Sequence, residues 1–256
     1  MKLIFRTLIL LLLSTSFFVV YFSYFGFETK RFNNEIIKKI KKIDNNFELE
    51  LKEIKILLNP LKFELNAKTI GTKLKSRDKV LEIEYIKTQI PLSSLFKEKF
   101  LIKNLEISSK LLEIEDLISF VRVLYNNPEF YILDKIVKKG FLIADIKLNF
   151  DVEGNIKDDF QINGFVKDTK IQILKKYELK KLDFNFSYNK DILKLSDIKL
   201  SLNNSNLLSK NLNLEKINNK FLITGDVETK NIDQNNQILL SFFKSYFPKL
   251  EIADLK

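Results

Sequence analysis

The chain has 256 residues, a formal net charge of +10, 45% hydrophobic residues, and no Cys, His or Trp. Without Cys and His it lacks disulfides, the usual zinc ligands, the usual general base and the thiol nucleophile. We therefore expect no enzyme activity, no catalytic residues, no metal and no cofactor. The carboxylate clusters Asp158-Asp159 and Glu113-Glu115-Asp116 are expected in turns or at a helix cap.

The positive charge lies mostly near the N-terminus. Residues 1–42 contain eight Lys or Arg and two Glu, which leaves only +4 of the net +10 for residues 43–256. Only four of the 43 basic residues are Arg, the residue best suited to bidentate phosphate and base contacts. We therefore expect no nucleic-acid partner. Basic side chains beside a membrane span are instead attracted to anionic headgroups.

Residues 1–27 are predicted to form a transmembrane anchor. Lys2 and Arg6 precede an uncharged apolar run from Thr7 to Phe27, and about 20 apolar residues cross the hydrocarbon core as a helix. The run has no small-residue cleavage site of the signal-peptide kind and ends in Tyr and Phe, which are enriched at membrane interfaces. We favour a retained anchor over a cleaved signal peptide, with the N-terminus in the cytoplasm and the bulk of the chain across the membrane.

Residues 28–45 are predicted to form an amphipathic helix next to the anchor. Asn33 or Asn34 is a suitable N-cap, and the isoleucines of segment 36–43 recur at helical spacing. Two placements stay open: a surface helix packed on the end of a sheet, or an interfacial helix lying on the bilayer. The basic residues expected at the membrane surface are Lys30, Arg31, Lys38, Lys39, Lys41 and Lys42.

Residues 46–115 are predicted to form a first β region, because the apolar period changes from 3.6 to 2. The alternation at Leu49 and Leu51 shifts by one at Ile54 and Ile56, which indicates a bulge or a strand boundary. A turn is expected at residues 59–60, followed by a strand in which residues 61, 63, 65 and 67 are apolar. Short alternating strands separated by polar clusters indicate an antiparallel sheet.

Residues 116–140 are predicted to form a helical insertion, 141–230 a second β region, and 231–256 a C-terminal helix and the start of a further strand. Asp116 is a suitable N-cap for the first inserted helix, which the residues before Pro128 are expected to stop. A second short helix is expected over 131–138, ending at Gly140. Regular alternation then begins at Ile146.

The predicted fold class is mainly β: the anchor, then a curved, elongated antiparallel sheet with a few short helices. The strands have one apolar face and too few helices to cover it. That face either packs against another face in a closed core, or it lines an open groove that an apolar ligand completes. The candidate groove residues are Phe63, Leu65, Ile83, Ile102, Phe150, Phe184, Phe186, Leu200, Leu202 and Ile223.

Three segments resemble the AsmA-like family of bacterial inner-membrane proteins, which includes AsmA, TamB and YhdP. They are LNPLKFELNAKTIG (58–71), VLEIEYIKTQIPLSSLFKEKFLIKNLEIS (80–108) and FQINGFVKDTKIQILKKYELKKLDFNFSYNKDILKLSDIKLSLNNSNL (160–207). The resemblance implies an inner-membrane anchor and an elongated periplasmic β-groove, taco-like in section. Periplasm-spanning members are much longer, so the chain resembles one end of such a bridge, a small member, or part of a longer protein.

The resemblance implies a protein that binds or conducts lipid acyl chains along its groove, contributing to phospholipid transport and outer-membrane assembly. Its expected partners are membrane lipids, phospholipid first, and envelope proteins. Two alternatives stay open. One is an LptC-like lipopolysaccharide-transport component, a single-span protein with a periplasmic jellyroll. The other is a non-transporting envelope-assembly scaffold, which closed sheets would favour.

Overall fold

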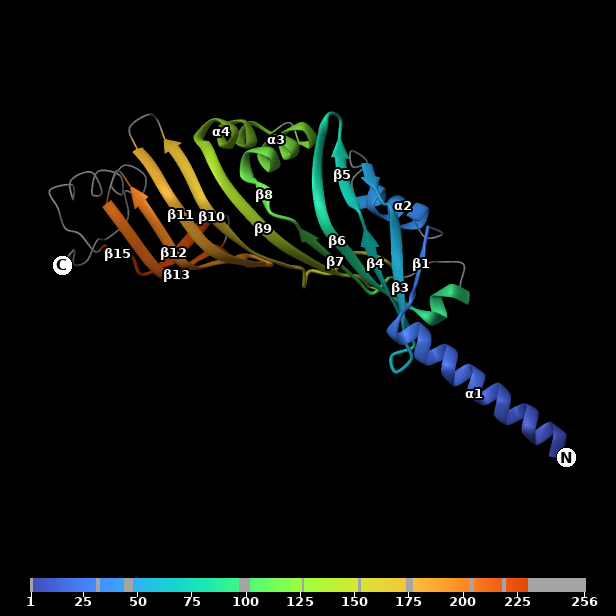
Figure 1. Ribbon diagram of the computed structural model, residues 1–256. Coiled ribbons are helices and arrows are strands. Elements are labelled where there is room, and N and C mark those ends of the chain that lie inside the picture. Colours follow the sequence, from blue (N-terminus) through green and yellow to red (C-terminus); the bar gives the residue numbers. More distant parts are fainter. Residues whose placement is uncertain are drawn as a thin grey trace. The chain divides into compact units, whose positions relative to one another are not determined.

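The computed structural model describes residues 2–30, 33–43, 48–96, 102–125, 127–151, 153–173, 177–202, 205–217 and 220–229. This part of the chain is mainly β, as predicted, with an N-terminal apolar helix and few other helices (Figure 1). The helices are α1 (Lys2–Tyr24), α2 (Asn33–Ile43), the 3₁₀ helix η1 (Leu92–Phe96), α3 (Ile114–Leu124) and α4 (Pro128–Ile136). The strands are β1 (Phe27–Thr29), β2 (Glu48–Glu50), β3 (Glu53–Asn59), β4 (Glu64–Ile70), β5 (Thr72–Ser76), β6 (Lys79–Pro91), β7 (Asn104–Ser109), β8 (Leu112–Glu113), β9 (Val137–Asn149), β10 (Gln161–Ile173), β11 (Tyr177–Asn189), β12 (Ile192–Leu202), β13 (Ser205–Ile217), β14 (Lys220–Gly225) and β15 (Glu228–Thr229).

The strands form one open antiparallel sheet, in the order β1-β3-β4-β6-β7-β9-β10-β11-β12-β13-β14. The short strands lie off this path: β5 joins β2 to β6, β8 pairs with β9, and β15 pairs with β13. Most neighbours in the sheet are also neighbours in the chain, as expected for hairpin connections. The chain divides into two compact units. Unit 1 comprises residues 1–110 and 144–162, and unit 2 comprises residues 111–143 and 163–256.

In unit 1, α1 leads directly into the edge strand of the sheet. None of its side chains is buried, and among the described residues it is the one helix long and apolar enough to cross a membrane. The helix ends at Tyr24, so Phe27 is not part of the span as predicted but opens β1, opposite Ile56 of β3. Gly26 makes this connection possible. Its φ is +66°, and a Cβ there would overlap the carbonyl oxygen of Ile56.

The apolar side chains of unit 1 form rows that cross neighbouring strands. In one row, Ile56 lies opposite Ala67, Ala67 opposite Thr88, Thr88 opposite Leu105, and Leu105 opposite Leu148. Directly paired residues project to the same face of a sheet, so the alternation seen in the sequence gives unit 1 one apolar face. Its buried core consists of Ile36, Leu49, Ile54, Ile56, Leu65, Ala67, Ile83, Ile86, Ile90 and Leu105.

The helix α2 lies against this apolar face. Ile36 is only 7% exposed and belongs to the core, and Ile37 packs beside it. The amide of Asn33 donates to the carbonyl of Leu51 at 3.3 Å, which ties the start of the helix to the segment between β2 and β3. Of the two placements left open by the sequence, the structure therefore has the helix packed on the sheet.

A pair of buried hydroxyls holds the bend between β4 and β5. The side chains of Thr69 and Thr72 lie 2.6 Å apart, and the backbone N–H of Ile86 donates to Thr69 Oγ1 at 2.8 Å. Gly71 lies between the two threonines with φ +64°, a conformation that glycine adopts without penalty. At the bend, the Thr69 hydroxyl thus accepts the backbone hydrogen bond of Ile86 that a carbonyl of the neighbouring strand would otherwise accept.

In unit 2, residues with left-handed backbone interrupt three consecutive strands. They are Asp168 in β10, Lys181 in β11 and Asp197 in β12, each with φ between 51° and 54°. The pairing of β11 with β12 shifts register twice near Asp183, as expected where an extra residue forms a bulge. Asp183 Oδ1 accepts the backbone N–H of Asp168 at 2.7 Å, which stabilises one of these interruptions.

The helices α3 and α4 belong to unit 2 and differ in their bounds from the predicted ones. The first begins at Ile114 with Glu113 as N-cap, so Asp116 lies in the first turn instead of capping it. The residues before Pro128 end α3, as predicted, and also begin α4. Asn127 caps α4, where its side chain accepts the N–H of Glu129 at 3.0 Å, and Pro at the first helical position is favourable.

The strand β9 begins earlier than predicted. It starts at Val137, so Gly140 is not a helix terminus but a strand residue with φ +153°. A Cβ at Gly140 would overlap the side chains of Thr169 and Ile114. The glycine therefore lets α3 approach the sheet closely, which is a reason for Gly within a strand. The predicted helix and strand of residues 231–256 lie outside the described residues.

Candidate functional site

The unit 2 apolar face is a set of cross-strand rows on β11, β12, β13 and β14. In one row, Tyr188 lies opposite Leu193, Leu193 opposite Leu214, and Leu214 opposite Ile223. A parallel row contains Phe186, Leu195 and Leu212. The face comprises Phe184, Phe186, Tyr188, Leu193, Leu195, Leu212, Leu214 and Ile223. All are partly exposed, and Ile223 is 42% exposed.

Two aromatic rings dominate this face next to β10. Phe184 and Phe186 are adjacent on one side of β11, with ring centroids 6.3 Å apart. A Cβ on Gly164 of β10 would overlap the carbonyl oxygen of Ile143 and would lie only 2.7–2.8 Å from the ring of Phe186. The ring therefore covers the glycine of the neighbouring strand, an arrangement that compensates the missing side chain. Large, half-exposed aromatic rings are favourable contacts for an apolar ligand.

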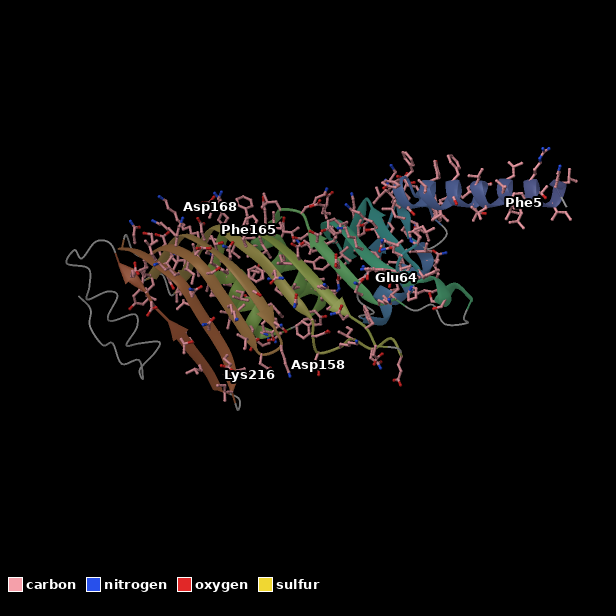
Figure 2. The ribbon with its side chains drawn as sticks, turned by 90° about the horizontal axis from the view of Figure 1, so that it is seen from below. Phe5, Glu64, Asp158, Phe165, Asp168 and Lys216 are labelled. Atoms are coloured by element: carbon pink, nitrogen blue, oxygen red, sulfur yellow. The ribbon has the colours of Figure 1, made fainter. Side chains whose placement is uncertain are left out.

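The opposite face of the same strands is polar. Asp183 of β11 lies opposite Lys199 of β12, and the amide of Asn185 donates to Asp197 Oδ2 at 2.9 Å. Phe165 of β10, labelled in Figure 2, is an exposed apolar residue that lines a depression of about 140 Å³ together with these polar side chains, Val166, Lys167 and Phe184. Unit 2 thus has one apolar and one mainly polar face, as the alternation predicted.

At the other end of the same strands the apolar side chains are buried. Tyr177, Leu202 and Leu207 form a small core, against which Leu200 packs. Leu202 lies opposite Leu179 on β11. The predicted candidates Leu200 and Leu202 are therefore adjacent, but they belong to a packed cluster rather than to the half-exposed rows.

In unit 1 the structure brings four predicted candidates together in the core. Leu65 and Ile83 are buried, and Ile102 and Phe150 pack against the same cluster. Since α2 also contributes to this cluster, the apolar face of unit 1 is largely covered within the chain. The sequence indicated the face but not its cover.

Phe63 is not a member of the apolar face, and its prediction as part of a strand was wrong. The strand β4 begins at Glu64, so Leu61 and Phe63 lie on the turn, where they are 92% and 73% exposed. Phe63 has φ +53°, which breaks the alternation that the sequence showed. The exposed side chain of Leu61 was likewise missed, because its spacing fits a continued strand.

The predicted basic cluster is described only in part. Lys30, Lys38 and Lys41 are exposed. Arg31 and the side chains of Lys39 and Lys42 lie outside the described residues. The exposed lysines of α2 are on the helix whose Ile36 is buried, as an amphipathic helix requires.

The carboxylates with a lowered pKa make local hydrogen bonds on the surface of the protein. Lys110 hydrogen-bonds to Glu82 at 2.7 Å and lowers the pKa of that carboxyl. The backbone N–H of Asn155 does the same to the pKa of Asp151 in a turn. Of the predicted clusters, Asp158-Asp159 is exposed in a turn, and Glu113-Glu115-Asp116 is at the start of α3. Within the described part of the chain, no three acidic side chains are grouped as metal ligands.

The chain matches no protein-family model, no curated protein and no solved structure. The fold and the half-exposed apolar rows are therefore defined by the structure of this chain alone. They define a protein with an open antiparallel sheet and an N-terminal helix that is long and apolar enough to cross a membrane.

Proposed function

We propose that this protein is anchored in a bacterial inner membrane and binds or conducts lipid acyl chains along the apolar face of its sheet. In this proposal the N-terminus is cytoplasmic, the sheet is periplasmic, and the protein contributes to phospholipid transport and outer-membrane assembly as a member of the AsmA-like family. The observation that carries the proposal is the set of half-exposed cross-strand rows in unit 2, in a chain with a helix able to cross a membrane.

The rows suit an acyl chain for a physical reason. They present adjacent Leu, Phe and Tyr side chains without charged residues between them along the row, so an extended hydrocarbon could contact one residue after another. Burying apolar surface gives about 25 cal/mol per Å², and exposed contiguous apolar patches mark interaction sites. The polar opposite face supplies no comparable surface.

Photo-crosslinking tests the proposal. A photo-crosslinking amino acid at Phe184 in the full chain, in its native membrane, is expected to capture lipid, which mass spectrometry then identifies. The matched control is the same amino acid at Leu222, an exposed apolar residue of β14 that lies opposite Glu215 and, because side chains alternate along a strand, projects to the face opposite Ile223. Adducts confined to Phe184 support the proposal. No lipid adduct at Phe184, or equal adducts at both positions, refutes it.

A scaffold function is the second candidate, and the observation that favours it is the closed core of unit 1. There α2 covers the apolar face, and Leu65 and Ile83 are buried. A photo-crosslinker at Phe150, which packs against this core, separates the two functions. Lipid adducts at both Phe150 and Phe184 indicate a conduit, whereas protein adducts alone at both positions indicate a scaffold.

A further inference from the structure

The turn between β3 and β4 exposes two large apolar side chains at one end of unit 1. Leu61 is 92% exposed and Phe63 is 73% exposed, with the exposed Lys62 between them. Water is an unfavourable environment for such side chains. The sequence places them at the tip of a four-residue connection, Pro60 to Phe63, which we call the β3–β4 tip.

The backbone of this tip is held in place. The carbonyl of Phe63 accepts the N–H of Leu92 in η1 at 2.9 Å, and the side chain of Asn59 accepts the N–H of Lys62 at 3.2 Å. At its base, Asn59 pairs with Glu64 across the hairpin. Glu64, labelled in Figure 2, is buried and forms an ion pair with Lys103. These contacts therefore hold the hairpin in a conformation that exposes the side chains of Leu61 and Phe63.

Phe63 also has a conformation that its side chain disfavours. Among the described residues, six non-glycine residues have positive φ, and the other five are Arg77, Asp168, Lys181, Lys190 and Asp197. Phe63 is thus the one apolar member of this group. Bulky residues rarely adopt left-handed backbone, and a disfavoured backbone that persists is a reason to look for a function.

The tip lies beside the end of the helix α1. Leu57, Pro60 and Leu61 line a cleft of about 440 Å³ together with residues from the last turns of α1, namely Val19, Val20, Ser23 and Tyr24. Figure 1 shows the β3–β4 turn projecting next to the point where α1 meets the sheet. The close packing of Gly26 against Ile56 holds the helix end at this position.

The level of the tip relative to a bilayer follows from the length of the helix. The 23 residues of α1 span about 35 Å at ~1.5 Å per residue, slightly more than the ~30 Å hydrocarbon core. The last turns, which carry Tyr21, Phe22 and Tyr24, would then lie at the interface, where aromatic rings are enriched. Because Leu61 and Tyr24 line the same cleft, the tip reaches the same level.

We propose that the β3–β4 tip inserts Leu61 and Phe63 into the interface of the bilayer that α1 spans. The inserted tip is a second contact with lipid and fixes the orientation of unit 1 at the membrane surface. Lys62 extends its ammonium group to the headgroups while its stem lies among the apolar groups. This inference rests on α1 spanning a membrane, which is part of the proposed function, and it does not depend on lipid in the unit 2 apolar face.

The absence of cysteine allows single-site labelling of the full chain. We would introduce Leu61→Cys, Val80→Cys and Ser14→Cys separately, attach an environment-sensitive fluorophore, and reconstitute each protein in phosphatidylcholine–phosphatidylglycerol vesicles containing spin-labelled lipid. Val80 is the matched control, since it is an exposed apolar residue of unit 1. It lies at the start of β6, whereas the other end of β6 pairs with Glu64 beside the tip. Ser14 reports on the middle of α1.

The expected result is strong quenching at Ser14 by deep spin labels, quenching at Leu61 by shallow ones with a blue-shifted emission, and no quenching at Val80. Leu61 quenched no more than Val80, while Ser14 is quenched, overturns the insertion of the tip and leaves the anchor standing. No quenching at Ser14 overturns the anchor and the insertion together. A water-soluble quencher added to the same vesicles identifies a third outcome. Protection of the Leu61 fluorophore from both the lipid and the water-soluble quencher indicates a protein partner at the tip and also overturns the inference.

Discussion

Replacing Ile36 with Ala tests whether α2 is a structural cover for the apolar face of unit 1. Ile36 is 7% exposed and lies in the unit 1 core. The substitution removes three buried carbon groups, worth about 2.4 kcal/mol at ~0.8 kcal/mol each. A cavity term adds to this, within a range of about 2–5 kcal/mol for such substitutions. An isolated helix of 11 residues is marginal in water, so its docking depends on contacts of this kind.

Amide hydrogen exchange of the full chain in detergent micelles measures this docking directly. A loss of about 2.4 kcal/mol lowers the protection of α2 amides by about 50-fold, since about 1.4 kcal/mol corresponds to a factor of ten. Lys41→Ala is the matched control, because Lys41 is exposed on the same helix and Ala favours helix formation. Its effect on protection is expected to be small.

Equal protection of α2 in the Ile36→Ala and Lys41→Ala proteins would contradict the reasoning. It would mean that the helix does not pack on the sheet through Ile36. The apolar face of unit 1 would then be open to a ligand, as the predicted groove requires, and the scaffold function would lose its supporting observation.

Three further substitutions test local features of the sheet. Gly164→Ala forces a Cβ against the carbonyl oxygen of Ile143 and the ring of Phe186 and should lower the free energy of unfolding by about 1–3 kcal/mol in urea denaturation. An unchanged midpoint would show that neither β9 nor the ring packs closely on the glycine. Thr69→Val leaves a buried backbone N–H without its acceptor and should cost about 1–3 kcal/mol; a neutral result would contradict that hydrogen bond. Lys110→Ala should raise the pKa of Glu82 toward its ordinary value in an NMR titration; the lowered pKa stabilises the fold above the unfolded-state pKa, and that contribution is lost as pH falls through the folded value.

Sequence patterning identified the strands well because period-2 alternation reports directly on a sheet with one apolar face. It also contained a signal for the bulges. The apolar Val166 and the buried Thr169 are three residues apart, as are the apolar Leu195 and Ile198, and each pair spans a left-handed Asp. An extra residue in a strand shifts the alternation by one in this way.

Alternation misled at the β3–β4 turn. Residues 61, 63, 65 and 67 follow an unbroken period of two, but the chain reverses through Pro60 and a left-handed Phe63. The sequence marks the start of the turn at residues 59–60, but no local pattern marks its extension to Phe63, since Phe is not a residue that favours left-handed backbone. The pairing of Glu64 with Asn59 and Pro91 fixes the start of β4, and those partners are set by tertiary contacts.

The sequence by itself determined the apolar N-terminal helix, the mainly β class, the antiparallel sheet and the existence of one apolar face. Each of these follows from local spacing and from the need to bury apolar side chains. Only the tertiary structure decided what covers that face. In unit 1, α2 packs on it and Leu65 and Ile83 are buried, whereas in unit 2 Phe184 and Phe186 remain half-exposed. Periodicity identifies the side chains on a face, but burial depends on elements distant in the chain, which periodicity does not record.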